Sequence, residues 1–277
     1  MNRLLVVGTE NDIASLSLFD NVLALLKEKV DDERIVKSIV NNIELTVFKK
    51  MNEMMYDELG FLKVKESLLD INIDSYSNDF DSICFLSKHA AKSENNSITM
   101  HAIGNFGKAL FGGIDNKLVS PEATLLSSLY RVASKKTTVT NIGGYELSME
   151  ATHHGPYSSK KCVFYELGST QTNWSDSEAA KALSEIFIEA LYKDRNYPSF
   201  FGIGSSHYCK GFESFLNEYD FAGSCPEYAL ADLKEEQLLF LSQYVAKFIF
   251  HPNVKKSEKK RIITLLEQNN LTYETLN

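Results

Sequence analysis

A strict alternation of apolar and polar residues runs from position 145 to position 152 and stops at a glycine–proline pair. The apolar positions are Tyr145, Leu147, Met149 and Ala151. This two-residue period is that of a β-strand buried on one face, and the Gly-Pro pair ends it with a turn. Glu150, His153 and His154 lie at the end of the predicted strand. The pattern therefore brings a carboxylate and two imidazoles to one place.

Four other apolar runs are typical of buried strands and also end in polar residues. Residues 83–86 lead to His89, residues 97–100 to His101, residues 162–165 to Glu166, and residues 200–204 to His207. Five of the six histidines thus lie at or just after a predicted strand. Open α/β sheets bind ligands outside the carboxyl ends of their strands, so we expect an active site there. The sixth, His251, precedes a proline at a predicted helix end and is expected to be structural.

Segments of helical periodicity separate these strands and favour an α/β sandwich. Ser175, with Glu178 three residues later, predicts a capping box for a helix with an apolar stripe over 179–191. A second helix is predicted to begin at Ser120-Pro121. A third is predicted to begin at Asp232 and to end before His251. Residues 52–81 show no clear period, and residues 1–250 are predicted to form a single catalytic domain with a basic helical tail, 251–277, appended.

Composition narrows the class of protein. The chain has 277 residues and a formal net charge of −8, so its surface as a whole does not attract nucleic acid, although local basic patches remain. Lys160-Lys161 follows the His-His-Gly-Pro turn and is expected to reach a substrate phosphate. No segment is long enough to span a membrane, and the apolar run 4–7 is too short for a signal peptide. The four cysteines form no C-x-x-C pair, which predicts reduced thiols and a cytoplasmic protein.

Three kinds of chemistry can be compared with this set of residues. Nucleophilic catalysis would use Ser205 or Ser206 beside His207, but the Gly-x-Ser-x-Gly elbow is absent. A phosphate-binding loop would need a Gly-x-x-x-x-Gly-Lys string, which is absent as well. Imidazoles and carboxylates converging on one water match metal- or histidine-assisted hydrolysis. Glu166 follows a very apolar run, where a carboxylate needs a cation, a hydrogen bond or a structural partner.

The same strings resemble the archaeal and plant type of D-aminoacyl-tRNA deacylase in their order and spacing. They are Ser87-Lys88-His89, residues 98–101 with 104–107, Glu150 to Pro156, Glu166 to Thr170, and His207-Tyr208. The resemblance implies a three-layer α/β/α sandwich with a mixed sheet, like nucleoside phosphorylases and peptidyl-tRNA hydrolase. It also implies hydrolysis of the ester between a D-amino acid and the 3′ end of tRNA, and zinc as the cofactor.

Carried onto this chain, the resemblance predicts three groups of site residues. The catalytic group is His153, His154, Glu150 and His207. The metal ligands are His89, His101, His154 and Glu166. The substrate-binding group is Asn105, Phe106, Gly155, Ser169, Thr170, Tyr208, Lys160 and Lys161. The partner is tRNA carrying a D-amino acid, no membrane contact is expected, and the protein is expected to be a monomer.

The chain departs from the family pattern at two places. Cys209-Lys210 stands where relatives continue with Ala-Pro, after Ser205-Ser206 in place of glycines, and Ser224 stands where a histidine is expected. Two other hypotheses therefore remain open. One is a nucleoside phosphorylase or metallopeptidase-like hydrolase of small substrates, and the other is a non-catalytic module that binds the tRNA end.

Overall fold

The computed structural model describes residues 1–49, 53–92, 94–139, 144–192 and 197–276. Its main sheet has eight strands in the order β2-β3-β4-β1-β5-β8-β6-β7. The strands are β1 (Arg3–Thr9), β2 (Ile35–Val40), β3 (Ile43–Lys49), β4 (Glu58–Val64), β5 (Ser82–Ala90), β6 (Ser97–His101), β7 (Glu146–Met149) and β8 (Lys161–Ser169). β4, β1, β5 and β8 run parallel, whereas β6 is antiparallel to β8 and parallel to β7. The sheet is therefore mixed, as predicted.

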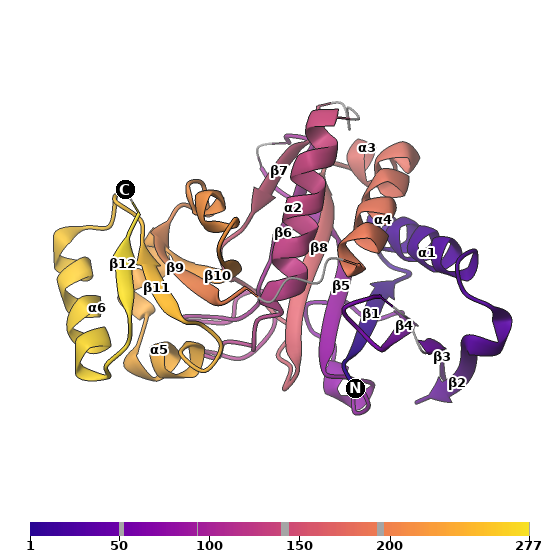
Figure 1. The fold of residues 1–277 in the computed structure, drawn as a ribbon, viewed down its shortest axis with the longest axis horizontal. Helices are drawn as coiled ribbons and strands as arrows, with labels where there is room; N and C mark the ends of the chain where they lie inside the picture. Colours follow the sequence, from indigo (N-terminus) through magenta and orange to yellow (C-terminus); the bar gives the residue numbers. More distant parts are fainter. Residues whose placement is uncertain (50–52, 93, 140–143, 193–196, 277) are drawn as a thin grey trace.

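A second, smaller sheet lies beside the first and is drawn in orange and yellow in Figure 1. Its four parallel strands follow the order β10-β9-β11-β12. They are β9 (Ser199–Ser205), β10 (Asp220–Pro226), β11 (Lys247–Phe250) and β12 (Tyr273–Thr275). The helices are α1 (Ile13–Lys27), α2 (Ala123–Val139), α3 (Gln171–Trp174), α4 (Ser177–Leu191), α5 (Glu235–Leu241) and α6 (Lys256–Gln268), with 3-10 turns η1 (Asp32–Arg34), η2 (Ile73–Ser75), η3 (Phe212–Phe215) and η4 (Glu227–Asp232).

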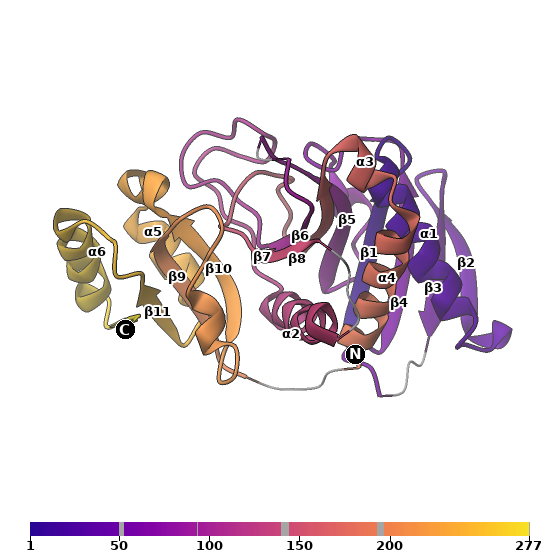
Figure 2. The same ribbon diagram turned by 90° about the horizontal axis from the view of Figure 1, so that it is seen from above.

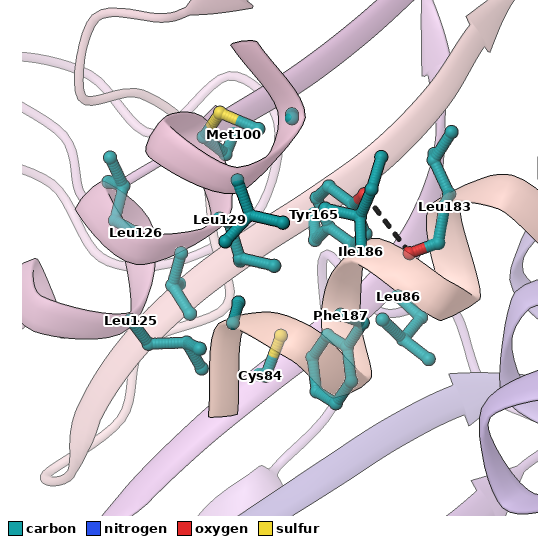
Figure 3. Packing of buried hydrophobic residues seen from close by; sticks show 14 of the residues in the cluster. Cys84, Leu86, Met100, Leu125, Leu126, Leu129, Tyr165, Leu183, Ile186 and Phe187 are labelled. Carbon is teal, nitrogen blue, oxygen red and sulfur yellow. Dashed lines mark hydrogen bonds between the residues drawn. The ribbon is translucent and has the colours of Figure 1, made fainter. Parts of the chain in front are cut away.

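Helices α1, α2 and α4 cover one face of the main sheet (Figure 2). Alternate strand residues such as Cys84, Leu86 and Tyr165 point into this layer and are fully buried. Figure 3 shows them packed against α2 and α4, where the Tyr165 hydroxyl donates a hydrogen bond to Leu183 O at 3.2 Å. The hydrogen bond lets a tyrosine occupy the core without leaving its polar atom unpaired.

The opposite face of the main sheet is covered by chain segments between strands and by the short turn η2. Strand residues on this face, including Phe85 and Phe164, pack against Leu68, Ile103 and Val119 from those segments. The α/β class and the mixed sheet predicted from the sequence are confirmed. The layer on this second face consists mainly of irregular chain instead of long helices, and such segments place functional side chains over a rigid sheet.

Several predicted element boundaries shift in the structure. α4 is capped by Asp176, which accepts from Ala179 N at 2.9 Å, and not by Ser175. α2 begins at Ala123, shortly after the predicted Ser120-Pro121 start. The prediction of one helix from Asp232 to His251 is wrong. α5 is short and is followed by strand β11, because the four-residue run 247–250 is buried in the second sheet.

The carboxyl-terminal segment is an integral part of the second sheet. α6 matches the predicted basic helix, but its Ile262 and Leu266 are completely buried in a core shared with α5 and the strands. β12 pairs in parallel with β11. The described residues of the predicted appended tail 251–277, which are 251–276, thus complete this part of the fold.

Candidate active site

The candidate site lies on the loop-covered face of the main sheet. Strand alternation points His89, His101 and Glu166 to this face from β5, β6 and β8. Glu166 Oε2 lies 3.3 Å from His89 Nδ1 and 3.8 Å from His101 Nε2, and it accepts a hydrogen bond from Thr99 Oγ1 at 3.1 Å. The predicted position at the carboxyl ends of the strands is confirmed for the parallel strands β1, β5 and β8 and is wrong for β6. Because β6 is antiparallel to β8, their carboxyl ends lie at opposite edges, and the side chains meet by sharing a face.

The His-His-Gly-Pro turn folds onto this face after β7. Gly104 N donates to His154 O at 2.9 Å, and Ile103 bridges to His153. Gly155 packs so closely that an added Cβ would lie 2.2 Å from Gly113 N and 2.5 Å from Leu69 O. Gly155 is therefore required by close backbone approach, and the turn holds both histidines in fixed positions over the sheet.

Three histidines present the same ring nitrogen to the site. His101, His153 and His154 place Nδ1 at 3.0, 2.7 and 2.6 Å from the carbonyl oxygens of Ala102, Ala151 and Gly155. A carbonyl only accepts, so each Nδ1 carries the proton and each Nε2 keeps its lone pair. One ring nitrogen from each histidine lies within 4.8 Å of the other two.

Electrostatics keep these three imidazoles neutral near pH 7. Burial lowers the pKa of His101 and His153 well below the usual value of a histidine, and repulsion from neighbouring histidines lowers it further. Burial also lowers the pKa of His154, to about 4. A neutral imidazole with a free Nε2 is the form that binds a metal or accepts a proton.

The other half of the site is rich in carboxylates. Glu150 is completely buried, and among the described residues neither of its oxygens has a hydrogen-bond partner. Its Oε1 lies 3.6 Å from His89 Nδ1 and 3.5 Å from His207 Nε2. Burial opposes protonation of His89, but the hydrogen bond to Glu166 and the charges of both glutamates outweigh burial and raise its pKa. His207 Nδ1 lies 3.2 Å from the hydroxyl of Tyr228.

A cavity of about 600 Å³ opens above these groups. His89, His153, His154, Glu166 and His207 line it, together with residues from the β1–α1 turn and from two loops. The size suits a ligand of several tens of atoms, and most of the lining residues are polar. The cavity brings four of the five predicted histidines and Glu166 to a common space.

The donor set fits a zinc ion. Zinc in proteins is bound by imidazole nitrogens and carboxylate oxygens. Two further groups, Glu150 with His153 and His207, and His89 with Glu150 and Glu166, also bring their donors within 4.8 Å of one another. The buried Nε2 atoms of His89 and His101 and both oxygens of Glu150 are without hydrogen-bond partners in the described part of the chain. A cation would satisfy the lone pairs of His101 Nε2 and of the Glu150 oxygens.

The predicted metal ligands do not form one separate set. His101 and His154 group with His153, which was predicted to be catalytic, whereas His89 and Glu166 group with Glu150. Sequence order alone does not reveal this division, because it depends on which side chains share a sheet face.

Four predicted substrate-binding residues have structural roles. Phe106 is buried in the core of the second sheet against Phe201, which leaves no ring face for a base. The Asn105 amide donates to Gly112 O at 3.0 Å. Ser169 and Thr170 hydroxyls donate to Asn95 O and Asn173 Oδ1 around the start of α3. Tyr208 is half-buried beside His89 and His207, as a residue of the site should be.

Lys160 and Lys161 lie far from the histidines. Lys161 is the first residue of β8, five positions before Glu166, which corresponds to about 16 Å along the strand. The chain after the His-His-Gly-Pro turn crosses the sheet face to the opposite edge, where Lys160 Nζ lies 3.5 Å from Asn78 O. The prediction that this pair reaches a phosphate at the site is therefore wrong.

Four cavity or neighbouring residues were not assigned a role from the sequence: Asp12, Lys88, Phe111 and Tyr228. Asp12 caps α1 by accepting from Ser15 N, and it also accepts from Lys88 N at 2.8 Å. Lys88 adjoins His89 in the string Ser-Lys-His, and this adjacency was a usable signal. The other three had none, because their elements join the site only in the folded chain.

The fold and this donor set define an α/β protein with a candidate hydrolytic centre. The family model described as D-aminoacyl-tRNA deacylase matches residues 76–274. The chain belongs to this family. A D-aminoacyl-tRNA deacylase of Picrophilus torridus is 30% identical over 82% of this chain and 84% of its own length. One of Sulfurisphaera tokodaii is 30% identical over 85% and 98%.

A crystal structure of a conserved protein of unknown function has the same fold. It superposes with a TM-score of 0.85 at 25% sequence identity and covers 99% of this chain and 95% of that chain. The match includes the second sheet and α6, so the carboxyl-terminal elements are common to both proteins.

Proposed function

We propose that this protein hydrolyses the ester that joins a D-amino acid to the 3′ end of tRNA. The observation that carries the proposal is a cluster of five histidines and two glutamates in a chain of the deacylase family, of which four histidines and Glu166 line one cavity while His101 and Glu150 are buried beside them. Hydrolysis requires an activated water, a stabilised oxyanion and a proton for the leaving oxygen. The imidazoles and carboxylates of the site can accept and donate protons and can stabilise charge, which are the three functions that hydrolysis requires.

We further propose that His101, His153 and His154 hold a zinc ion through Nε2. Support comes from the carbonyl acceptors that fix each Nδ1 proton and from burial that keeps each ring neutral. Second partners of this kind are typical of histidines that bind metals. Zinc held there would supply Lewis acidity, which lowers the pKa of a bound water and polarises a carbonyl oxygen.

The protein's own groups then move the protons. Glu150, whose carboxylate oxygens accept no hydrogen bond from the described residues, takes a proton from the attacking water as the water oxygen adds to the ester carbonyl carbon. His207, 3.5 Å from Glu150, donates a proton to the ribose oxygen as the bond between the carbonyl carbon and that oxygen breaks. The products are the free D-amino acid and tRNA with a free terminal hydroxyl.

Lys88 is the best placed basic side chain for the tRNA backbone. It lines the cavity, is exposed, and has its Nζ 4.9 Å from the ring centre of Trp174. Its backbone is fixed by the bond to Asp12. We assign to Lys88 the phosphate contact that the sequence suggested for Lys160-Lys161, with Tyr208 at the ester end.

Three of the departures from the family pattern, Ser205, Cys209 and Ser224, lie together, and none of the three lines the cavity. Ser224 Oγ lies 3.0 Å from Ser205 Oγ and 2.9 Å from Cys209 Sγ, and all three residues are buried. These side chains satisfy one another next to the end of β7, where Cys209 N donates to Met149 O. This arrangement favours an active enzyme over a module that only binds the tRNA end.

No helix in the described part of the chain is long and apolar enough to cross a membrane. We propose a cytoplasmic monomer, on the basis of four free buried cysteines and of a site formed within one chain.

The decisive experiment is a deacylation assay with matched D- and L-aminoacyl-tRNA. We expect release of the D-amino acid to be much faster than release of the L-amino acid. Equal rates for both esters would reject the assignment. A chelator should remove the activity, and added zinc should restore it. Zinc binding, measured by calorimetric titration, should be lost in His101→Ala. Full activity in a protein shown to be free of metal would reject the zinc proposal alone.

A further inference from the structure

Leu110, Phe111 and Ile114 place three large apolar side chains in water on one loop. They are 79%, 68% and 46% exposed. Exposed apolar side chains gathered in one place commonly mark a contact surface, because burying them in a complex is favourable. Of the three, Phe111 lines the cavity that contains the site histidines. Leu110 and Ile114 do not line it.

The loop holds Phe111 in a fixed position. Phe111 O accepts from Gly155 N of the histidine turn at 3.0 Å, and Gly112 O accepts from the Asn105 amide at 3.0 Å. Gly112 has a φ of +74° and packs so tightly that an added Cβ would lie 1.9 Å from Leu69 O. An exposed ring on a backbone fixed at both sides is organised before a ligand arrives, which lowers the entropy cost of binding.

A basic side chain that can contact a phosphate lies in the cavity beside Phe111. It is Lys88, which lines the same cavity and is exposed. The lysines next to the loop are partly paired: Lys108 forms an ion pair with Asp115, which also accepts from Ala109 N and fixes the loop base, and Lys234 Nζ donates to Asn116 Oδ1 at 2.8 Å.

We propose that the Phe111 ring is the platform on which the terminal base of the nucleic acid stacks when its ester enters the site. This inference rests on the proposed function and adds to it the residue that positions the substrate. The terminal nucleotide carries the ester, so its base must lie within one nucleotide of the histidines. Phe111 shares their cavity and is bonded to their turn. Stacking uses the face of a base and suits single-stranded ends.

The test compares Phe111→Ala, Phe111→Trp and Phe111→Leu with Leu110→Ala as the matched control. Leu110 is the neighbouring residue, is more exposed, and lies outside the cavity lining. Phe111→Ala should raise KM for D-aminoacyl-tRNA about 5- to 150-fold, the range expected for loss of one base–aromatic contact, with kcat changed much less. Trp should restore KM, Leu should restore it only partly, and Leu110→Ala should stay within about twofold.

A binding measurement separates this inference from the proposed function. An RNA minihelix that ends in a single-stranded CCA and carries no amino acid should bind the wild type. Phe111→Ala should weaken that binding by a factor similar to the rise in KM. The measurement needs no catalysis, so it holds even if the wild type fails to deacylate. Unchanged KM and unchanged minihelix affinity in a folded Phe111→Ala protein, or no binding of the minihelix by the wild type, would overturn the assignment.

Discussion

The five site histidines differ in the acceptor that each Nδ1 faces. His101, His153 and His154 face backbone carbonyls, which fix one neutral tautomer, and burial lowers their pKa. His89 faces two glutamates, and its pKa is raised. The site is thus divided into a neutral half suited to a metal and a half in which an imidazolium is stabilised. Hydrolysis needs both conditions within a few ångströms.

Removal of the His154 side chain should abolish most of the activity. His154→Ala deletes one of the three Nε2 donors, and turnover should fall at least about 100-fold, the lower end expected for a positioned catalytic group. Single-turnover deacylation measures this directly. His251→Ala is the control, because its ring packs against Phe212 and its Nδ1 accepts only from Asn253 N. A folded His154→Ala protein with near-wild-type rates would exclude His154 from the mechanism.

The lowered pKa of His154 also predicts a dependence of stability on pH. The unfolded histidine takes up a proton near pH 6.5, whereas the folded one does so only near pH 4. Between these values unfolding binds a proton, so acid lowers the free energy of unfolding. Between pH 7 and pH 5, the free energy of unfolding of the chelator-treated wild type should fall by about 1–2 kcal/mol more than that of His154→Gln. Equal losses in urea titrations of the two proteins would contradict the pKa assignment.

At the scale of elements, the sequence predicted the strands that carry the histidines but not how those strands pair. Alternation over 145–152 and the apolar run 162–165 locate β7 and β8 without giving their direction or neighbours. The antiparallel placement of β6 beside β8 explains why the site lies on a sheet face. β4 was missed within 52–81, because its buried residues lie among polar segments, and β11 was too short to distinguish from a helix.

The error about Lys160-Lys161 has the same cause, because the sequence does not show how the strands are arranged in space. Proximity in sequence to the histidine turn suggested proximity in space, but the chain crosses the sheet before β8 begins. A strand then carries Glu166 back toward the site at about 3.3 Å per residue. The adjacency of Lys88 to His89 was a usable signal, but the sequence does not show that the Lys88 side chain lines the cavity.

Salt dependence should distinguish these two positions. Lys88→Ala removes one phosphate contact, so the slope of log KM against log salt concentration should flatten by about 0.7 to 0.9. The double variant Lys160→Ala/Lys161→Ala should leave the slope of the wild type unchanged, because both residues lie at the far edge of the sheet. Steady-state assays with full-length D-aminoacyl-tRNA over a range of potassium chloride measure both. The reverse outcome would move the tRNA backbone to the opposite edge.

At the scale of the whole molecule, both sheets contribute residues to the site. The main sheet supplies His89, His101 and Glu166, whereas His207 and Tyr228 follow strands of the second sheet. Arg131 on α2 links the two parts through a pair with buried Asp220 at 2.8 Å and bonds to Leu216 O and Tyr219 O. The stability of the second sheet therefore matters for the position of His207.

Residues at the carboxyl terminus should contribute to that stability. Leu266 of α6 is completely buried among α5 and the second sheet, so Leu266→Ala should lower the free energy of unfolding by about 2–5 kcal/mol. Thr264→Ala, on the exposed side of the same helix, should change it by less than about 0.5 kcal/mol. Urea unfolding followed by tryptophan fluorescence and circular dichroism measures both. If residues 251–277 were only an appended tail, Leu266→Ala would be as harmless as Thr264→Ala.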